Sequence, residues 1–298
     1  MCGALLFGLL TLPLAHGDSQ DFWALFSDGR AELNGYTLVQ PRYGQLRNGY
    51  AVLIYVTEPF SRSRRVKVDS YDPGNPDHFI ALKLNQIRRF QTGIYDYALM
   101  TSVFAQPLKS MHPVKVSFSS QEWCGQIHEE IQLESHEVRI RTQSYFEGET
   151  KTKTLKGILA SEDALWITAR GLTRGGPGSG NFKSPMIGSA ILRRLHHLKA
   201  EPVTGQFKWS KSNIQTVPAG RFSVRDLTWR RQDGHTCAMS VEIPAPHRIV
   251  QWRCSDGERA QLTGTRRLAY WSKAREGDER LLKGLGLPVP SLERGSER

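Results

Sequence analysis

The stretch Thr236–Cys254, TCAMSVEIPAPHRIVQWRC, carries the clearest fold information in the chain. On either side of Pro244–His247 apolar and polar residues alternate, which is typical of a β-hairpin with one buried face. If Pro244–His247 is a four-residue loop, the opposed pairs on that face are Val241 with Val250, Met239 with Trp252, and Cys237 with Cys254. A slip of one residue would turn the apolar set to the other face and separate the cysteines. The stretch therefore predicts one register.

The same register predicts a disulfide between Cys237 and Cys254. Directly opposed residues of an antiparallel pair have Cα atoms about 4.5 or 5.5 Å apart, and a disulfide spans about 4.4–6.8 Å. Cys124 is then the odd thiol of the mature chain. A cysteine within a strand is usually a small buried apolar group, and we expect Cys124 to be one.

Strand patterns continue outward from the hairpin. Ala51–Thr57 is a run of β-branched and aromatic residues, and Val138–Phe146 alternates apolar with polar side chains. Only Met186–Lys199 has apolar residues at spacings of three and four, as in a helix. The sequence predicts a mainly β fold: a large twisted antiparallel sheet or half-barrel with one amphipathic helix near residues 186–199.

The composition is that of a globular protein. The 298 residues are 39% hydrophobic and 23% charged, which excludes wholesale disorder, collagen and coiled coil. Five segments are expected: a signal peptide (1–17), an N-terminal β-rich region (18–170), a Gly/Pro/Ser-rich loop or linker (171–185), a helix with a β-meander on the same sheet (186–272), and a mobile tail (273–298).

The start of the chain predicts export. Residues 4–14 are apolar apart from one threonine, and Ala15-His16-Gly17 places small residues where a signal peptidase cuts. The run is shorter than the roughly 20 residues that a membrane-spanning helix needs. We expect a periplasmic or secreted protein with no transmembrane anchor after cleavage, in a compartment that favours disulfides.

The net charge of +11 makes anionic partners conceivable. Basic residues gather between Arg193 and Arg231, with aromatic residues among them. In an exported protein the available anions are lipid headgroups and cell-envelope polymers, so nucleic acid is not the expected partner. The candidate contacts to an anionic surface are Arg193, Arg194, Lys208, Lys211, Arg230 and Arg231.

No motif identifies a reaction. The chain lacks Gly-x-Ser-x-Gly, a Walker loop and His-Glu-x-x-His. Trp123-Cys124-Gly125 lacks the second cysteine of a thioredoxin motif, and His235, Cys237, His247 and Cys254 match no standard zinc module. We therefore expect no metal and no cofactor.

Three segments carry a family resemblance: Thr57–Ser61 (TEPFS), Thr92–Tyr97 (TGIYDY) and Gln121–Gly125 (QEWCG). With them, the first 150 residues resemble a family of uncharacterised exported bacterial proteins, some of which are labelled septum formation inhibitor. The inhibitor family proper is a nucleotide pyrophosphatase with a Ser-x-Ser-Pro-Arg-Arg start, and this chain has no such motif.

The second half is similar to periplasmic proteins whose curved antiparallel sheet is akin to the carriers of lipoprotein localisation. The resemblance rests on Pro218–Phe222 (PAGRF), the cysteine hairpin, and Ser255–Glu258 (SDGE) before a last strand. It implies a fold and carries over no catalytic residue.

Together these features predict an exported, non-enzymatic protein that binds an apolar or amphiphilic ligand, a lipid or acyl chain, on a curved sheet. The candidate ligand contacts are Tyr95, Tyr97, Gln121, Glu122 and Trp123. Two alternatives stay open. One is an exported enzyme that uses Cys124, and the other is a cell-envelope protein that binds an anionic polymer.

Overall fold

The structure is a computed structural model that describes residues 18–107, 111–157 and 160–290. The predicted signal peptide lies outside the described residues. Within them, no helix has the length and apolar character needed to cross a membrane. Strands dominate, and all of them belong to one sheet of 16 strands, which confirms the mainly β fold.

The strands in chain order are β1 (Ala31–Arg42), β2 (Gln45–Ser61), β3 (His78–Thr92), β4 (Tyr95–Gln106), β5 (His112–Glu122), β6 (Gly125–Leu133), β7 (Glu137–Ser144), β8 (Lys151–Lys156), β9 (Ala160–Ser161), β10 (Asn181–Ile187), β11 (Pro202–Trp209), β12 (Asn213–Val217), β13 (Gly220–Arg231), β14 (Thr236–Glu242), β15 (Ile249–Cys254) and β16 (Arg259–Leu268). The helices are α1 (Asp18–Phe26), η2 (Glu162–Ala164), α2 (Leu165–Thr168), α3 (Ala190–Leu195), η3 (Tyr270–Ser272) and η4 (Asp278–Leu285), of which those marked η are 3₁₀ helices.

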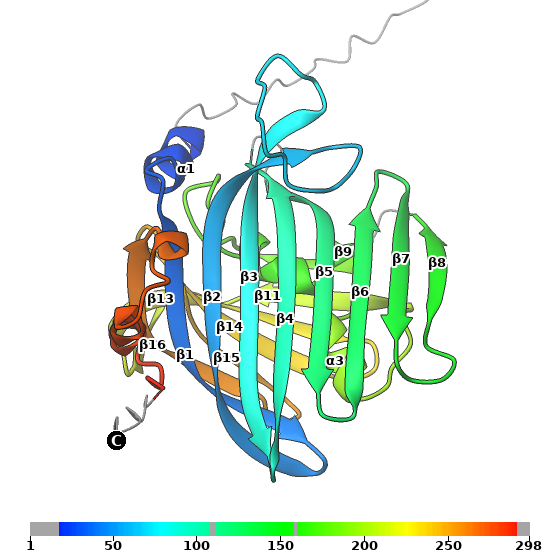
Figure 1. Cartoon of the computed structure of the whole chain (residues 1–298). Helices are drawn as coiled ribbons and strands as arrows, with labels where there is room; N and C mark the ends of the chain where they lie inside the picture. Colours follow the sequence, from blue (N-terminus) through cyan, green and yellow to red (C-terminus); the bar gives the residue numbers. More distant parts are fainter. Residues whose placement is uncertain (1–17, 108–110, 158–159, 291–298) are drawn as a thin grey trace, which may run out of the picture.

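The sheet is a long curl that does not close on itself. Its order is β8-β7-β6-β5-β4-β3-β2-β1-β16-β15-β14-β13-β11-β10-β9, with β12 paired to β13. Neighbouring strands run antiparallel except β9 and β10, which are parallel, so the sheet is mixed rather than wholly antiparallel. Figure 1 shows β2–β5 as one wall, with β11 and β13–β15 crossing behind it.

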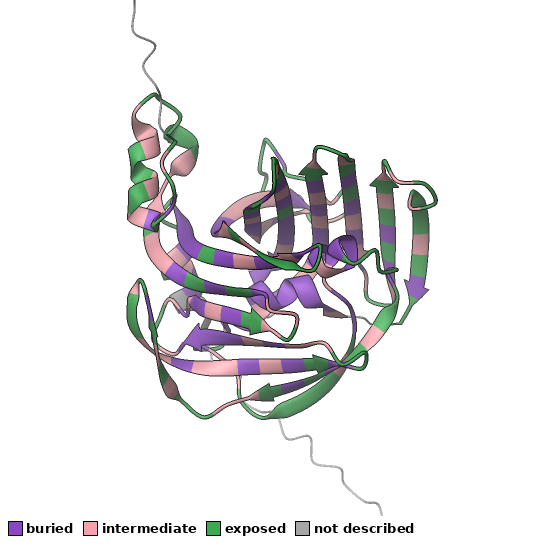
Figure 2. Cartoon of the chain, turned by 90° about the horizontal axis from the view of Figure 1, so that it is seen from below, coloured by how far each residue is buried: buried purple, intermediate pink, exposed green. Residues whose placement is uncertain are grey.

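The inside of the curl is filled by protein. Between β8 and β11 the chain passes through η2, α2 and α3, and most of the side chains of these helices are buried. Figure 2 shows buried helical turns surrounded by the strands. Trp166 of α2 packs edge-on against Trp252 of β15, with ring centroids 4.7 Å apart. The interior is therefore a packed core and not one open cavity.

The C-terminal segment covers the outer face of the sheet. Along β2, Val52, Ile54 and Val56 point outward and pack with Leu285 and Leu287. A Cβ added to Gly35 would lie 2.1 Å from the carbonyl oxygen of Leu285, so the two backbones touch. Residues 282–287 of the segment predicted to be a mobile tail therefore pack against the sheet, and residues 291–298 lie outside the described residues.

The cysteine hairpin forms as predicted at its cysteine end and differs at its turn. Cys237 pairs with Cys254 and Met239 with Trp252, and the predicted disulfide is present. Val241 pairs with Ile249 instead of Val250, because a β-bulge falls between Ser240 and Val241. Ile249 and Val250 are both buried, so alternation of polarity could not reveal the extra residue.

The predicted helix over residues 186–199 is only partly present. Met186 and Ile187 belong to β10, which begins at Asn181, so residues 181–185 of the expected loop are strand as well. Gly188 lies against the guanidinium of Arg231. A Cβ added to Gly188 would be 2.9 Å from Nη1 of Arg231. The Ser189 hydroxyl accepts the N–H of Leu192, and α3 covers only Ala190–Leu195.

Candidate functional site

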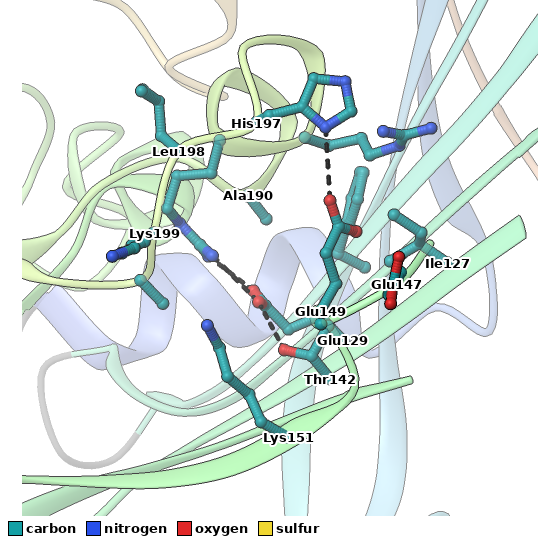
Figure 3. A pocket seen from close by; sticks show the side chains of 15 residues that line it. Ile127, Glu129, Thr142, Glu147, Glu149, Lys151, Ala190, His197, Leu198 and Lys199 are labelled. Carbon is teal, nitrogen blue, oxygen red and sulfur yellow. Dashed lines mark hydrogen bonds and ion pairs between the residues drawn. The ribbon is translucent and has the colours of Figure 1, made fainter. Parts of the chain in front are cut away.

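A pocket of about 240 Å³ opens between α3 and the far end of the sheet, at β6–β8; we call it the α3 pocket (Figure 3). Its lining is Phe118, Ile127, Glu129, Thr142, residues 147–149, Lys151, Ala190, Arg193, Arg194 and residues 197–200. Phe118, Ile127, Ala190 and Ala200 are buried and form an apolar floor. The rim is charged.

One buried ion pair joins α3 to the sheet inside this pocket. Arg193 Nη1 and Nη2 donate to the two carboxylate oxygens of Glu129, at 2.9 and 2.5 Å. Thr142 donates a further hydrogen bond of 3.1 Å to Glu129. This two-pronged geometry fixes the angle of α3 against β6.

The rim carries cations that lack a partner. Lys151, at the start of β8, and Lys199, after α3, are exposed. Within the described part of the chain neither ammonium group forms a hydrogen bond or an ion pair, although both charges lower the pKa of the nearby Glu201, which is itself paired with Lys153. Glu147 is an exposed carboxylate on the same rim, and His197 pairs with Glu149 at 3.3 Å. The rim therefore has a small excess of positive charge.

Arg194 adds unused hydrogen-bond donors. Its side chain is only 4% exposed, Nη2 lies 3.5 Å from Glu122, and the guanidinium carbon lies 4.4 Å from the ring centroid of Phe146. Nε and Nη1 are buried without a hydrogen-bond partner. An unpaired buried donor costs free energy, which an acceptor brought by a ligand would recover after a small side-chain movement.

Two carboxylates from inside the curl hold the start of α3. Glu162 accepts the N–H of Ser189 at 2.9 Å, and Asp163 accepts the N–H of Ala190 at 3.0 Å. Burial raises the pKa of Asp163 to about 6, although the Ala190 N–H and the charge of Arg193 act in the opposite direction. The pocket wall is thus fixed to the core at its first residues.

The residues expected to bind an apolar ligand lie outside this pocket. Tyr97 is fully buried, stacks on Phe90 at 4.8 Å and accepts a hydrogen bond from Arg42. Tyr95 lies at the end of the β3–β4 hairpin, with its ring 6.3 Å from that of Trp123, which is 70% exposed.

Gln121 and Glu122 end the strand before Trp123. Gln121 is exposed, whereas the side chain of Glu122 is 2% exposed and pairs with Arg194. The structure therefore brings Tyr95, Tyr97 and Trp123 near one another at the hairpin ends, and none of the five expected contacts lines the α3 pocket.

Three of the six residues expected on an anionic surface are buried. Arg193, Arg194 and Arg231 form ion pairs with Glu129, Glu122 and Glu162, so the prediction of surface contacts is wrong for them. A run of basic residues reveals nothing about carboxylates that come from distant strands. Lys208, Lys211 and Arg230 are exposed, as expected.

Cys124 is free and exposed in the turn between β5 and β6, so the prediction of a buried cysteine is wrong. Its backbone N–H donates to Glu122 at 2.6 Å. The hydrogen bond and negative charge of Glu122 raise the pKa of the Cys124 thiol. A nucleophilic cysteine needs the opposite shift.

Among the pocket residues that the sequence did not single out are Lys151, Lys199, Glu149 and His197. They come from two segments about 50 residues apart in the chain, and each is an ordinary surface residue type. No spacing rule connects them, because only the curl of the sheet brings β8 beside α3.

Comparisons with known proteins identify no family. Neither the models of known families nor the curated proteins give a match. Among solved structures, a crystal structure of a beta-barrel-like protein of domain of unknown function DUF1849 from Brucella abortus is similar. The two chains are 12% identical, the alignment covers 80% of this chain and 97% of that one, and the TM-score is 0.47.

A likeness at this TM-score says nothing about the septum formation label or the lipoprotein-localisation carriers, so both resemblances stay predictions.

Proposed function

We propose that this protein is an exported, non-enzymatic binding protein that holds a small amphiphilic molecule with an acidic head group in the α3 pocket. The observation that carries the proposal is the pairing of an apolar floor with unpartnered cations at the rim. An acyl chain would cover Phe118, Ile127 and Ala190, and its carboxylate or phosphate would meet Lys151 and Lys199. Such a site combines burial of apolar area with a few oriented polar groups.

The size of the pocket limits the ligand. Sites for drug-sized molecules usually measure about 300–1,000 Å³, and the α3 pocket measures about 240 Å³. It takes a short chain, or the first part of a longer one whose remainder emerges along the rim. The packed interior of the curl excludes a ligand the size of a whole phospholipid from that space.

Two features favour a binding protein over an enzyme that uses Cys124. Glu122 raises the pKa of the Cys124 thiol, the opposite of the shift that a nucleophilic cysteine needs, and Cys124 does not line the pocket. Export is supported by the disulfide, which persists in oxidising compartments.

The test is a titration with cis-parinaric acid, a fluorescent fatty acid, and with its uncharged alcohol. We expect Lys151→Glu and Lys199→Glu each to weaken binding of the acid by about tenfold, ~1.4 kcal/mol, and to leave the alcohol almost unaffected. The matched control is Lys208→Glu, a charge reversal on exposed β11, which should change neither. If both pocket variants bind the acid as tightly as the wild-type protein does, the assignment of the site is disproved.

A second variant tests the apolar floor. Ile127→Trp fills the pocket and should abolish binding of both the acid and the alcohol. If the wild-type protein binds neither molecule, and native mass spectrometry of protein from the periplasm shows no bound amphiphile, the proposal fails as a whole.

A shallow hollow on the outer surface favours the anionic-polymer alternative. Lys183, Lys208 and Arg230 surround Phe182, which is 47% exposed and stacks on Phe207 at 4.6 Å. Cations around an exposed ring suit an anionic polysaccharide. This second function predicts that the protein is retained on heparin, that retention falls steeply with salt, and that Arg230→Glu abolishes it. Retention that does not depend on salt would argue against this function.

A further inference from the structure

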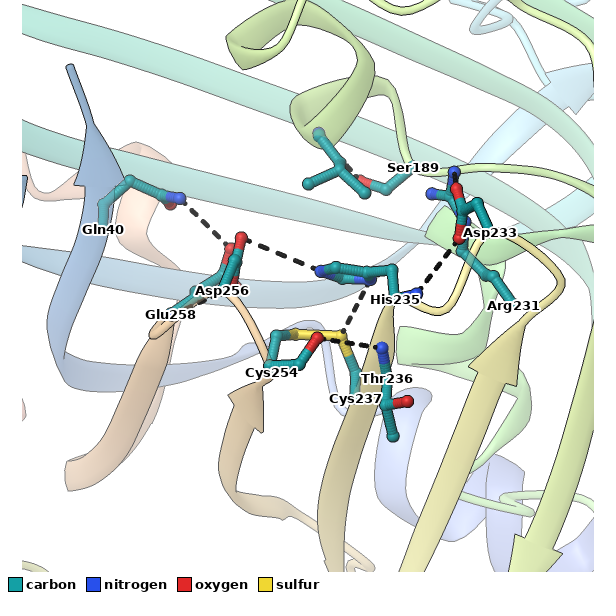
Figure 4. A network of polar contacts seen from close by, with 12 residues as sticks. Gln40, Ser189, Arg231, Asp233, His235, Thr236, Cys237, Cys254, Asp256 and Glu258 are labelled. Atoms are coloured by element: carbon teal, nitrogen blue, oxygen red, sulfur yellow. Dashed lines mark hydrogen bonds and ion pairs between the residues drawn. A yellow bond between two sulfur atoms is a disulfide. The ribbon is translucent and has the colours of Figure 1, made fainter. Parts of the chain in front are cut away.

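The Cys237–Cys254 disulfide lies beside a histidine and an aspartate at the ends of two hairpins (Figure 4). His235, from the β13–β14 turn, places Nδ1 3.7 Å from Cys237 Sγ. Its other ring nitrogen, Nε2, lies 3.7 Å from Asp256 Oδ2 in the β15–β16 turn. The order of groups is carboxylate, imidazole, sulfur.

The two sulfurs differ in their surroundings. Cys237 is buried, at 3% exposure, and its sulfur is the one that faces the imidazole. Cys254 is only half-buried. An incoming group therefore reaches Cys254 first, and the imidazole is placed to stabilise charge on Cys237.

A metal site is a poorer interpretation of the same residues. The ligand atoms of His235, Cys237 and Cys254 lie within 4.8 Å of one another. The disulfide occupies both sulfurs, and a metal needs thiolates.

We propose that this disulfide is a site of thiol–disulfide exchange, attacked at Cys254 with Cys237 as the leaving sulfur. The co-reactant is a thiol, either a small molecule or a cysteine of another protein. Its thiolate forms a new S–S bond to Cys254 as the Cys237–Cys254 bond breaks, and the electron pair of that bond passes to Cys237 Sγ. The products are a mixed disulfide on Cys254 and a thiolate on Cys237, so electrons balance without an external oxidant.

The neighbours of His235 support this role. The Asp256 carboxylate, 3.7 Å from Nε2, raises the pKa of His235 against the effect of burial, and Glu162 adds to the increase while Arg231 opposes it. An imidazolium donates an N–H from both ring nitrogens: one to Asp256, the other toward the departing sulfur. A stabilised leaving thiolate speeds exchange. The chemistry uses no residue of the α3 pocket, so it stands or falls independently of the proposed function.

The experiment uses the full mature chain with Cys124→Ser, so that the disulfide holds the only cysteines. The oxidised protein is incubated with reduced glutathione, quenched with acid and mapped by peptide mass spectrometry. We expect glutathione on Cys254. His235→Gln and Asp256→Asn should each slow exchange by about threefold or more, because both weaken stabilisation of the leaving sulfur.

The control is His128→Gln, which changes an exposed histidine on β6 and should leave the rate unchanged. Loss of stability in a variant exposes the disulfide and accelerates exchange, so slower exchange cannot arise from unfolding. Glutathione found mainly on Cys237 would overturn the proposal. So would rates in both His235→Gln and Asp256→Asn that equal or exceed the wild-type rate.

Discussion

Replacing Asp163 by asparagine should stabilise the protein at neutral pH and have little effect near pH 4. The Asp163 carboxyl is 1% exposed, and one of its oxygens accepts the N–H of Ala190 at the start of α3. Asparagine keeps an oxygen that accepts this hydrogen bond and carries no charge. The variant therefore removes the cost of burying a carboxylate and retains the contact that holds α3.

The magnitude follows from the pKa. Burial raises the pKa of Asp163 from 3.8 to about 6, so the folded protein holds this proton more tightly than the unfolded chain does. The free energy of unfolding must then fall as pH rises from about 4 to about 6. At about 1.4 kcal/mol for each pH unit between the two values, the wild-type protein loses ~3 kcal/mol that the variant keeps.

The assay is urea denaturation of both proteins at several pH values between 4 and 7, with the disulfide intact. Trp166 and Trp252 are buried near the middle of the curl and report on unfolding by fluorescence. The difference between the two proteins should grow across this range, since other titrating groups cancel. A difference that is the same at pH 4 and pH 7 would show that the carboxylate is not penalised by burial.

Three further changes test the packing of the fold. Cys254→Ser removes the disulfide to Cys237, which has a sequence separation of 17, and should lower the free energy of unfolding by about 3 kcal/mol. Reduction of the disulfide in the wild-type protein should lower it by the same amount. Arg170→Met leaves Glu32 buried without its counter-charge 2.9 Å away and should cost about 3–5 kcal/mol. Adding Glu32→Leu to Arg170→Met should recover most of that loss. If the double variant loses the sum of the two single losses, Arg170 and Glu32 are not energetically coupled. Leu285→Ala should cost about 2–4 kcal/mol in the same urea assay, whereas an unchanged midpoint would mean that the C-terminal segment does not contribute to stability.

The sequence alone predicts the structure correctly where the pattern that decides it is local. The cysteine register could be predicted because alternation, turn residues and two cysteines lie within one hairpin. Val250 shows the limit, since a bulge between two adjacent apolar residues leaves no trace in the pattern. Met186 and Ile187 fit the apolar spacing of a helix and also that of a strand. Only their pairing with β11 makes them part of a strand.

The site depended on contacts that the sequence does not display. Arg193 and Arg194 are surface residues by composition, yet the carboxylates that bury them stand on β6 and at the end of β5. Lys151 and Lys199 lie at the rim of one pocket only because the curl places β8 beside the segment after α3. Local chemistry therefore predicted the cysteine pair, whereas the pocket is a product of the topology.

The sheet ends at β8, whose outer edge pairs with no strand of the described chain. A free edge offers hydrogen-bonding groups to any extended peptide and invites ordered aggregation. Along β8, Lys151, Lys153 and Lys156 stand among threonines and a single leucine, and Lys153 also binds Glu201 from the segment after α3. A second copy of this strand would have to bring like charges together to pair with it. Lysines along an open edge disfavour such pairing, so β8 is a poor template for a further strand although the sheet stops there.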